Sequence, residues 1–594
     1  MEPNDTKELD QAMTITPLSW HSVRVGGDWR RRLDLTRDQL LSDRLFSPEL
    51  VLQDVYLHPD KRRACDDYAG DLSGRYVECL TMLQTFNDAE YPKLRAVAME
   101  IVTAQHADGH FGAKSPFAAT DHGQVWGNGR LLCGLVRYYL DTRYPEDKPA
   151  LYEAAVRLGD YFIQTFDYWE AWWQHEANRN HKFATDYGTV IHACLQLYRI
   201  TGERKYIGLA ERIAVFTPRS GEGKYHMHGV LLSMRGILEL YEITGRESYL
   251  ETVLQVWKEV YHGFMLASGS VLESFKSPRD INTEGCGIAD WFMLNLQLWR
   301  VTGRPNYLHL AEKILYNGLF HVQTGSGHYG CETLCPDPGL LTHDYYPEAW
   351  WCCTHHGVVA MLEAVGSAYC TAGDSVYVNF YVPSQAALKL PDDTNVTIRQ
   401  ETGYPYDSRI KLSLESSGPA KLSLRLRVPE FAMVGAVLVN GQPAAAAFES
   451  GFLVLSRTWQ PGDTVELSLE FGIWVGDHNR QYYRYYTNCT DDGVFLGTRS
   501  MAVYYGPLLL AADGTRNQVD DLLRIRTAVI PLEGDAFRVR RLEGDELAFA
   551  VKCKGYGSDI ANEIVLSPIG NQVFDPGLVT CRYLFDQLEF TSIS

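Results

Sequence analysis

The stretch LYRITGERKYIGLAERI, residues 197–213, decides the fold class. An apolar helix end runs into Thr201 and Gly202, a charged turn follows, and a new amphipathic helix begins near Tyr206. Glycine suits the position after a helix C-terminus because the backbone there turns left-handed. The stretch therefore predicts a hairpin of two α-helices.

The same pattern returns twice, in LYEITGRESYLETVLQVW (240–257) and LWRVTGRPNYLHLAEKILYN (298–317). Repeated helical hairpins stack into an open solenoid or close into a ring. A solenoid usually keeps a more regular period, whereas long Gly-rich insertions with His, Trp and Glu separate these hairpins. Polar and aromatic side chains on loops over a helical scaffold mark a site. We therefore predict a closed α/α toroid with these loops over one mouth.

The residue pattern changes from helical to strand-like after about residue 374. Segments such as RIKLSLES (409–416) and TVELSLEFGI (464–473) alternate between apolar and polar residues, as strands of an antiparallel β-sandwich do. VNGQP (439–443) carries an Asn-Gly hairpin signal. The predicted fold is multidomain α + β. Its expected parts are an N-terminal segment that adds a strand to a β-domain (1–25), a helical domain (26–373), a β-sandwich (374–476) and a second β-rich domain (477–594).

Composition and charge limit the expected binding partners and the expected cellular location of the protein. Lys and Arg number 55 against 74 Asp and Glu, a net charge of −19, and no basic run interleaves with aromatics, so we expect no nucleic-acid partner. No apolar run approaches the length of a membrane span, and the first 20 residues lack the basic and apolar regions of a signal peptide. The 13 cysteines are odd in number and scattered, unlike a disulfide framework. The expected location is therefore the reducing cytoplasm.

Two segments, TEGCG and CCTHHG, place metal-binding side chains at predicted helix starts. Glu284 and Cys286 precede one helix, and Cys352 and Cys353 precede another, for which Thr354 is the expected N-cap. Unpaired N–H groups and the helix dipole favour thiolates there. Three thiols and a carboxylate are an acceptable ligand set for Zn²⁺. The spacing matches no standard zinc finger, so two unrelated buried thiols and a surface glutamate explain these residues about equally well.

Further polar candidates lie on the same loops. Glu273, in GSVLESF, follows a Gly-Ser turn where a carboxylic acid could protonate a leaving group. A solvated loop glutamate is the commoner explanation of such a residue. His226 and His228, in YHMHG, and His355 and His356 are candidate partners of hydroxyl groups or a metal. Single histidines of this kind are more often ordinary surface or capped residues.

Taken together, these motifs resemble the β-L-arabinofuranosidase-like enzymes of glycoside hydrolase family 127. QHADGHFG is similar to the family's Q-x-x-D-G-Y-L turn, GSVLESF to its E-[AS]-F loop and TEGCGIADWF to its E-T-C-A helix start. AEKILYNGL resembles E-R-x-L-Y-N-x-x-L, and WWCCTHHGVVAML resembles W-x-x-C-x-C-C-P-P-N. The sandwich segments RQETGYPYD, LRLRVPEFA and VYYGPLLLAA follow in the family's order. So many co-linear motifs, over nearly the whole length, make the resemblance specific.

The resemblance implies a catalytic (α/α)₆ barrel followed by β-sandwich domains. It also implies one Zn²⁺ held by Glu284, Cys286, Cys352 and Cys353, with Cys352 as the nucleophile and Glu273 as the general acid/base. Elementary chemistry agrees with these implied roles, because Zn²⁺ deprotonates a thiol that is otherwise mostly protonated at neutral pH. A zinc-bound thiolate is also a tolerable leaving group, which suits a two-step retaining mechanism.

The chain departs from the family around the expected sugar pocket. Relatives carry histidines on three early inter-helix loops, but here the first reads DHGQVWGNGR and the second TDYGTVIHA, with a tyrosine where a histidine would fall. Only the third keeps histidines, and the family's Pro-Pro-Asn after the cysteine pair is Thr-His-His here. We therefore expect an intact zinc centre and an altered sugar pocket. The expected sugar contacts are Tyr187, His226, His228, Glu312 and His355.

The leading hypothesis is a zinc- and cysteine-dependent exo-glycosidase that acts on a short oligosaccharide or glycoside. Its sugar need not be L-arabinofuranose, and a homodimer is left open. The first alternative is an α/α-barrel hydrolase or lyase that uses carboxylates and holds zinc only for structure. The second is a non-catalytic carbohydrate-binding protein. Loss of turnover in Cys352→Ser favours the leading hypothesis over the first alternative, and sugar release that Glu273→Gln abolishes excludes the second.

Overall fold

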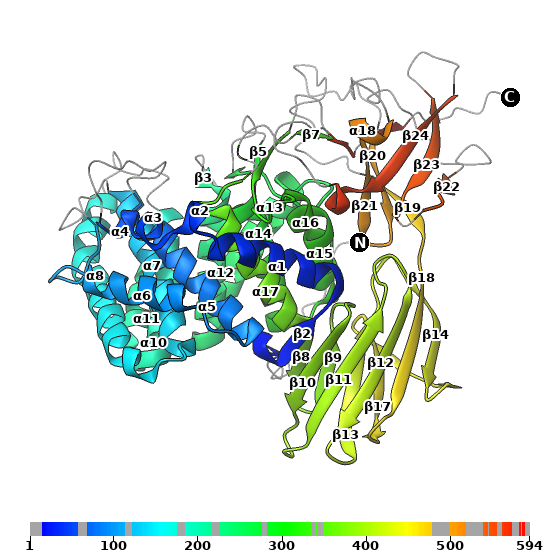
Figure 1. Cartoon of the computed structure of the whole chain (residues 1–594), viewed down its shortest axis with the longest axis horizontal. Coiled ribbons are helices and arrows are strands. Elements are labelled where there is room, and N and C mark those ends of the chain that lie inside the picture. The colour runs from blue at the N-terminus through cyan, green and yellow to red at the C-terminus, as the bar shows by residue number, and fades with distance from the viewer. Residues whose placement is uncertain are drawn as a thin grey trace. The chain divides into compact units, whose positions relative to one another are not determined.

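The computed structural model describes residues 15–56, 68–112, 121–174, 185–216, 225–275, 282–334, 339–342, 346, 348–477, 499–517, 539–544, 546–554, 561–572, 581–583 and 585–587. The chain divides into two compact units, each assembled from separate stretches (Figure 1). The smaller comprises Met1–Gly27, Leu296–His309 and Glu363–Glu470, and the larger comprises Asp28–Asn295, Leu310–Leu362 and Phe471–Ser594. The expected domain boundaries at residues 25, 373 and 476 stay predictions. In the described ranges, no helix combines the length and the apolar character that crossing a membrane needs.

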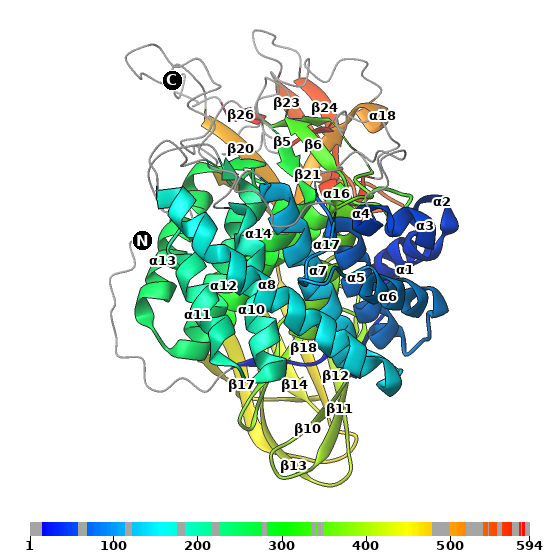
Figure 2. The same cartoon turned by 90° about the vertical axis from the view of Figure 1, so that its left-hand side faces the viewer.

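Helices of the larger unit form an inner and an outer set. The inner helices are α5 (Asp71–Asn87), α7 (His122–Asp141), α10 (Gly188–Thr201) and α12 (Met227–Thr244), and each contacts the next. The outer helices are α6 (Pro92–Thr103), α8 (Lys148–Gln174), α11 (Arg204–Ala214) and α13 (Glu247–Gly263), each against the inner helix before it. Figure 2 shows α10 to α13 side by side. Helices α5 and α7 are buried on nearly all sides, as the core layer of such an arrangement requires.

Shorter and later helices complete the helical part. They are α1 (Gly27–Leu41), α2 (Asp43–Phe46), α3 (Pro48–Val51), α4 (Gln53–Tyr56), α14 (Gly285–Thr302), α15 (Pro305–Ile314), the π-helical turn η4 (Leu315–Leu319), α16 (Phe320–Val322) and α17 (Cys353–Ser367). The predicted hairpin turns are confirmed, because Gly202, Gly245 and Gly303 follow α10, α12 and α14 with φ of 72°, 67° and 66°. A helical domain combined with sheet-rich domains is also confirmed, whereas closure into six hairpins stays a prediction.

Glycines let the inner helices α5 and α7 approach closely. A Cβ atom on Gly134 would lie 2.4 Å from the carbonyl oxygen of Gly74, and one on Gly74 would lie 2.6 Å from the backbone nitrogen of Leu131. Real Cβ atoms do not tolerate such distances to backbone, since interiors are already close-packed. These glycines therefore set the spacing of two helices that carry residues toward the interior.

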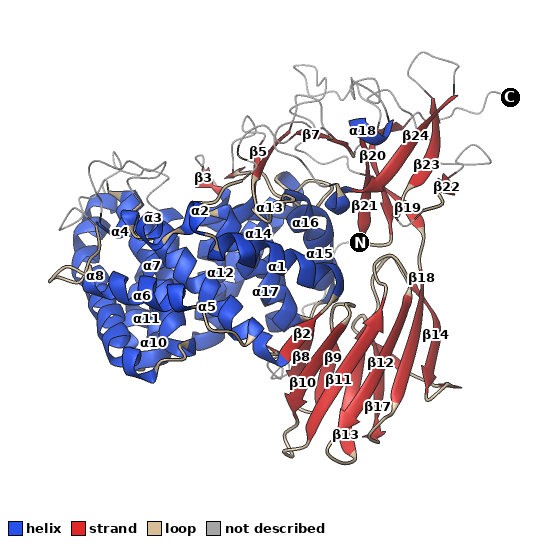
Figure 3. Cartoon of the chain, viewed as in Figure 1, coloured by secondary structure: helices blue, strands red, loops and turns tan. Residues whose placement is uncertain are grey.

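The smaller unit contains two sheets, seen among the red strands of Figure 3. The first has the order β1 (Thr16–Pro17), β8 (Tyr369–Ala372), β9 (Ser375–Val378), β13 (Ala420–Arg427), β17 (Phe452–Trp459) and β16 (Ala447–Glu449). The second has the order β15 (Gln442–Pro443), β14 (Met433–Val439), β18 (Thr464–Glu470), β12 (Arg409–Ser416), β11 (Asn395–Thr402), β10 (Ser384–Lys389) and β2 (Val23–Val25).

Strand patterns in these sheets follow the sequence signals. Alternate residues of β11 and β12 are buried, as expected when one face of a sheet covers a core. The Asn-Gly signal is confirmed, because Asn440 and Gly441 have φ of 52° and 74° and join β14 to β15. The pairing is antiparallel except between β13 and β9, which run parallel.

A third sheet joins parts of the larger unit that are far apart in sequence. Its order is β22 (Val539–Arg541), β23 (Phe549–Lys554), β24 (Ala561–Pro568), β21 (Leu508–Asp513), β25 (Cys581–Arg582), β7 (Leu340–Thr342), β6 (Cys331–Leu334) and β5 (Asn282–Glu284), with β19 (Ile473–Asp477), β20 (Arg499–Tyr505) and β26 (Phe585–Gln587) attached. C-terminal strands thus pair with loops of the helical domain. The hydroxyl of Tyr504 donates to the carbonyl of Ala267 at 2.9 Å. Tyr504 and Leu509 share a core with Leu266 and Leu272, so the C-terminal strands brace the loop that leads to Glu273.

Candidate active site

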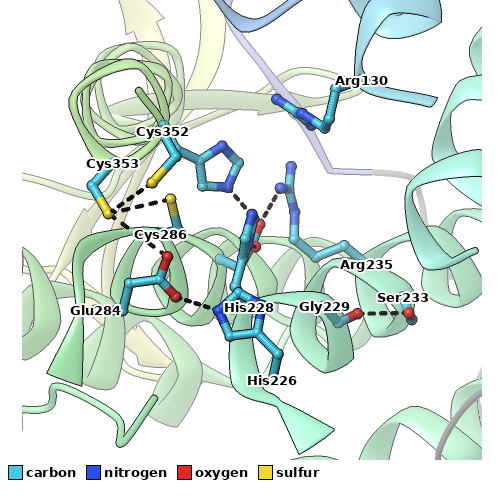
Figure 4. Close-up of polar contacts among 12 residues, drawn as sticks. Arg130, His226, His228, Gly229, Ser233, Arg235, Glu284, Cys286, Cys352 and Cys353 are labelled. Atoms are coloured by element: carbon cyan, nitrogen blue, oxygen red, sulfur yellow. Dashed lines mark hydrogen bonds and ion pairs between the residues drawn. The ribbon is translucent and has the colours of Figure 1, made fainter. Parts of the chain in front are cut away.

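Two chain segments converge to form a cluster of three thiols and a carboxylate. Glu284 is the last residue of β5, and Cys286 lies in the first turn of α14. Cys353 begins α17, and Cys352 directly precedes it. The four side chains can each offer one ligand atom such that all lie within 4.8 Å of one another (Figure 4). The sequence prediction that these four residues meet is therefore consistent with the structure.

The helix in the CCTHHG segment begins two residues earlier than expected. Because α17 starts at Cys353, Thr354 lies inside its first turn and is not the N-cap. Its hydroxyl instead accepts the backbone N–H of Tyr329 at 3.2 Å and lies 3.1 Å from Nδ1 of His328. The backbone carbonyl of Cys352 accepts the N–H groups of His355 and His356. The Thr354 hydroxyl thus connects the first turn of α17 to residues 328–329.

The residue between Glu284 and Cys286 has to be glycine. A Cβ atom on Gly285 would lie 2.9 Å from the carbonyl oxygen of Gly330 and 3.1 Å from the Cβ of Cys353. The backbone N–H of Gly285 also donates to the carbonyl of Gly330 at 3.1 Å. The close approach of these backbones brings the E-x-C segment against the start of α17.

The distances within the cluster suit a tetrahedral metal ion. The Sγ atom of Cys353 lies 3.5 Å from each of the other two sulfurs and 3.7 Å from Oε1 of Glu284. Zinc–sulfur bonds of about 2.3 Å in a tetrahedron place neighbouring sulfurs roughly 3.7 Å apart. Burial raises the pKa of the Cys286 thiol well above its ordinary range, with Cys352 adding to the shift. A dication is the natural partner for such a group of buried thiols, because it favours their charged form.

Exposure distinguishes the three thiols. Cys286 and Cys353 are fully buried, whereas Cys352 is partly exposed. A reacting molecule can therefore reach the sulfur of Cys352 more readily than the other two.

A second carboxylate, Glu273, lies beside the cluster. Ligand atoms of His226, Glu273 and Glu284 all lie within 4.8 Å of one another. The backbone of Glu273 is held on both sides, since its N–H donates to the carbonyl of Asn282 and its carbonyl accepts from the N–H of Met227, both at 2.7 Å. These bonds fix the half-buried Glu273 between β5 and the start of α12.

The two carboxylate oxygens of Glu284 contact different groups. Its Oε1 points to Cys353 and its Oε2 lies 2.7 Å from Nε2 of His226 (Figure 4). Although burial opposes ionisation, the charge of His226 lowers the pKa of the Glu284 carboxyl, and Glu284 in turn raises the pKa of His226 to about 9. His226 keeps 39% of its side-chain surface exposed, so it also faces the solvent side of the cluster.

Below the thiols lies a fully buried network of His228, Asp290 and His356. Asp290 accepts from Arg235 at 2.6 Å and His356 at 2.9 Å, and its other oxygen is bonded to Nδ1 of His228. Three donors therefore already occupy the carboxylate of Asp290. The sequence patterns did not single out Asp290. Its position one helical turn after Cys286 was the available signal, since residues i and i+4 share a helix face.

The remaining expected sugar contacts lie in the interior. Tyr187, His228, Glu312 and His355 are at most 2% exposed. Tyr187 contacts the rings of Phe166 and Trp169, and His355 contacts those of Phe46 and Tyr76. Of the five candidates, only His226 combines exposure with closeness to the cluster. Contact of any of them with a sugar stays a prediction.

Comparison with known proteins identifies the class of enzyme. The profile of the "Beta-L-arabinofuranosidase, GH127 catalytic domain" matches residues 64–364, and that of the "GH127 middle domain" matches residues 375–471. No curated protein sequence matches the chain significantly. The chain is therefore a glycoside hydrolase.

Solved structures agree on the fold. A GH127 β-arabinofuranosidase superposes with a TM-score of 0.76 at 18% identity, covering 98% of this chain and 99% of its own. A GH127 β-L-arabinofuranosidase from Geobacillus stearothermophilus T6 superposes with a TM-score of 0.74 at 16% identity, covering 95% of this chain and 100% of its own. The chain belongs to the β-L-arabinofuranosidase family GH127, as the sequence motifs predicted.

Proposed function

We propose that this protein is a zinc-dependent retaining exo-glycosidase that uses Cys352 as nucleophile and Glu273 as general acid/base. The observation that carries the proposal is the exposure of one thiol, Cys352, in an otherwise buried cluster of three thiols and Glu284. The proposed substrate is a short oligosaccharide or glycoside. The β-L-arabinofuranosides named for the family are the first sugars to test.

Zinc would be held by Glu284, Cys286, Cys352 and Cys353, and when bound it would keep the thiols deprotonated at neutral pH. In the first step, the Cys352 sulfur forms a bond to the anomeric carbon while the bond to the leaving oxygen breaks. The Glu273 carboxyl gives that oxygen its proton. In the second step, the Glu273 carboxylate takes a proton from water, the water oxygen bonds to the anomeric carbon, and the Cys352 thiolate leaves. One water is consumed and configuration is retained.

A screen of aryl glycosides, with the zinc content of the same sample measured, tests the proposal. We expect about one zinc per chain and turnover of at least one glycoside. Cys352→Ser should lower kcat on the order of 10⁴-fold or more, because the attacking group is gone. Cys194→Ser is the matched control: Cys194 is a buried thiol on α10 and should be replaceable without such a loss. Carefully reduced protein without zinc would overturn the proposal.

Substrates whose leaving groups differ in acidity distinguish the role of Glu273 as acid in the first step from its role as base in the second. Glu273→Gln should slow the hydrolysis of substrates with poor leaving groups by about 10²–10⁴-fold. With an acidic phenol as leaving group, the first step needs no proton, so the glycosylated enzyme should accumulate. Mass spectrometry of the intact protein should then find the added mass of one sugar, and peptide mapping should place it on the peptide that contains Cys352. A sugar on any other residue contradicts the assignment of the nucleophile.

One observation favours a second candidate. Carboxylate oxygens of Glu273 and Glu284 lie within 4.8 Å of each other, near the separation of about 5–5.5 Å used by retaining glycosidases with two carboxylates. In that reaction Glu284 would attack and zinc would serve structure alone. Near-normal turnover by zinc-loaded Cys352→Ser would favour this candidate.

Two wider expectations belong with the proposal. The nine cysteines whose side chains the structure describes are free thiols, which supports a place in the reducing cytoplasm. A homodimer stays a prediction that light scattering can test.

A further inference from the structure

A buried arginine from a distant helix reaches the thiol cluster. Arg75 lies on α5 and is 1% exposed. Its Nη1 donates to Sγ of Cys286 at 3.9 Å, its Nη2 lies 3.1 Å from Nε2 of His228, and its Nε donates to Asp71 at 2.7 Å. All three nitrogens of one guanidinium are thus directed at defined partners.

Asp71 fixes one side of this guanidinium. The same oxygen that accepts Nε of Arg75 also accepts the indole N–H of Trp126 at 2.9 Å. The Trp126 ring lies 5.9 Å from the guanidinium carbon. Arginine presents its donors in a rigid planar fork, so fixing Nε also fixes the direction of the other two nitrogens.

His228 contacts the other side of the Arg75 guanidinium, and Asp290 determines which ring nitrogen of His228 carries the proton. Nδ1 of His228 is bonded to Asp290, an ionised carboxylate that can only accept. His228 therefore carries its proton on Nδ1, which leaves Nε2 free to accept from Arg75. Arg235 and His356 bind the Asp290 carboxylate from other directions and hold it in place.

The charge of the cluster explains what an arginine does there. Three thiolates and a carboxylate carry four negative charges, twice the charge of Zn²⁺, in a site where Glu284, Cys286 and Cys353 are buried and Cys352 is partly exposed. A guanidinium N–H directed at sulfur lowers the free energy of the thiolate form, since charge-assisted hydrogen bonds are the strong ones. Its donor points at the buried Cys286 and not at the partly exposed Cys352.

We infer that Arg75 is a positioning residue of the zinc centre: oriented by Asp71 and by the Asp290–His228 relay, it stabilises the Cys286 thiolate as a ligand that does not attack. Cys352 thereby remains the more electron-rich and more accessible thiolate. This inference rests on the proposed function, because it requires the zinc ligand set described above.

Zinc affinity, measured on the intact zinc-loaded enzyme by competition with a chromogenic chelator, tests the inference. Groups that support metal ligands typically contribute 10–100-fold to metal affinity, so Arg75→Gln should weaken zinc binding by about that factor. Arg75→Lys should recover only part of the affinity, because the ammonium keeps the positive charge but lacks the planar fork that Asp71 and His228 orient. Arg75→Gln should also lower kcat with little change in KM, since Arg75 acts through Cys286 and not on the substrate.

Arg130→Gln is the matched control. Arg130 is also a buried arginine, 3% exposed, but its guanidinium donates to Glu78 at 2.7 Å. Its replacement removes a buried charge without removing a donor to sulfur, so zinc affinity should stay at the wild-type value. Unchanged affinity in Arg75→Gln, or an equal loss in Arg130→Gln, overturns the inference.

The remaining outcomes separate the inference from the proposed function. If Arg75→Gln does not fold, Arg75→Lys decides: zinc affinity weaker than that of the wild type supports the inference, and wild-type affinity overturns it. A wild type without zinc, or full turnover by Cys352→Ser, overturns the proposed function. A zinc-loaded, Cys352-dependent wild type with unaltered Arg75→Gln overturns the inference alone.

Discussion

Replacing Asp290 by asparagine should strongly destabilise the larger unit. Comparison with an exposed ion pair of the same length gives the size of the expected loss in unfolding free energy. Asp290 is fully buried and its oxygen lies 2.6 Å from Nη1 of Arg235. Asp167 forms an ion pair of the same length, 2.6 Å, with Arg212, but 76% of its side chain is exposed. The two pairs therefore differ in burial and not in distance.

Burial changes what each pair contributes. At this separation the Coulomb attraction is about 6 kcal/mol at an effective dielectric of 20 and about 1.6 kcal/mol in water. Removing one partner of a buried pair costs about 3–5 kcal/mol, because the other charge stays buried and uncompensated. In Asp290→Asn the new NH₂ group also faces one of three donors, from Arg235, His228 and His356. We expect a loss of about 3–5 kcal/mol for Asp290→Asn and at most about 1 kcal/mol for Asp167→Asn.

Urea unfolding followed by the helical circular dichroism signal at pH 7 measures both variants. Their midpoints, compared with that of the wild type, give the difference between the buried and the exposed pair. If Asp290→Asn and Asp167→Asn lose stability equally, within about 1 kcal/mol, burial of the Asp290 network does not have the energetic role assigned here.

Three further predictions concern packing, pH and metal. Gly134→Ala should destabilise by about 1–3 kcal/mol, because its Cβ would meet the carbonyl of Gly74; Gly208→Ala, on a helix with open space around it, should be neutral or stabilising, and the reverse order of their unfolding midpoints would contradict the packing argument. Burial and the neighbouring Arg427 lower the pKa of His309 to about 3. His309 therefore stays neutral in the folded state, whereas in the unfolded state it binds a proton below about pH 6.5. Stability should therefore fall as pH drops from 6.5 towards 3, and His309→Gln should lose about 2–3 kcal/mol less than the wild type between pH 7 and 4.5; equal losses would refute this. Excess EDTA should lower the thermal midpoint of the wild type, and re-addition of zinc should restore it, since a ligand that binds only the folded state stabilises it; an unmoved midpoint would count against a bound metal.

Features that depend on neighbours along the chain were predictable. The Thr-Gly turns, the Asn-Gly hairpin and the strand alternation each follow from the conformations that a few consecutive residues prefer. The cysteine and glutamate motifs were likewise readable, because both pairs lie at the start of a helix. The combination of these motifs also predicted the family.

Tertiary structure decided what surrounds those motifs. Arg75 precedes Cys286 by 211 residues, and no local pattern connects them. Glycines that let α5 approach α7, and a relay from α12 and α14, bring its guanidinium to the sulfur. The C-terminal strands likewise reach the Glu273 loop only through a shared sheet and core. The sequence alone therefore determined which groups could do chemistry, whereas packing between distant segments decided which charges and hydrogen bonds those groups meet, because electrostatic and hydrogen-bond energies depend on separation in space and on burial.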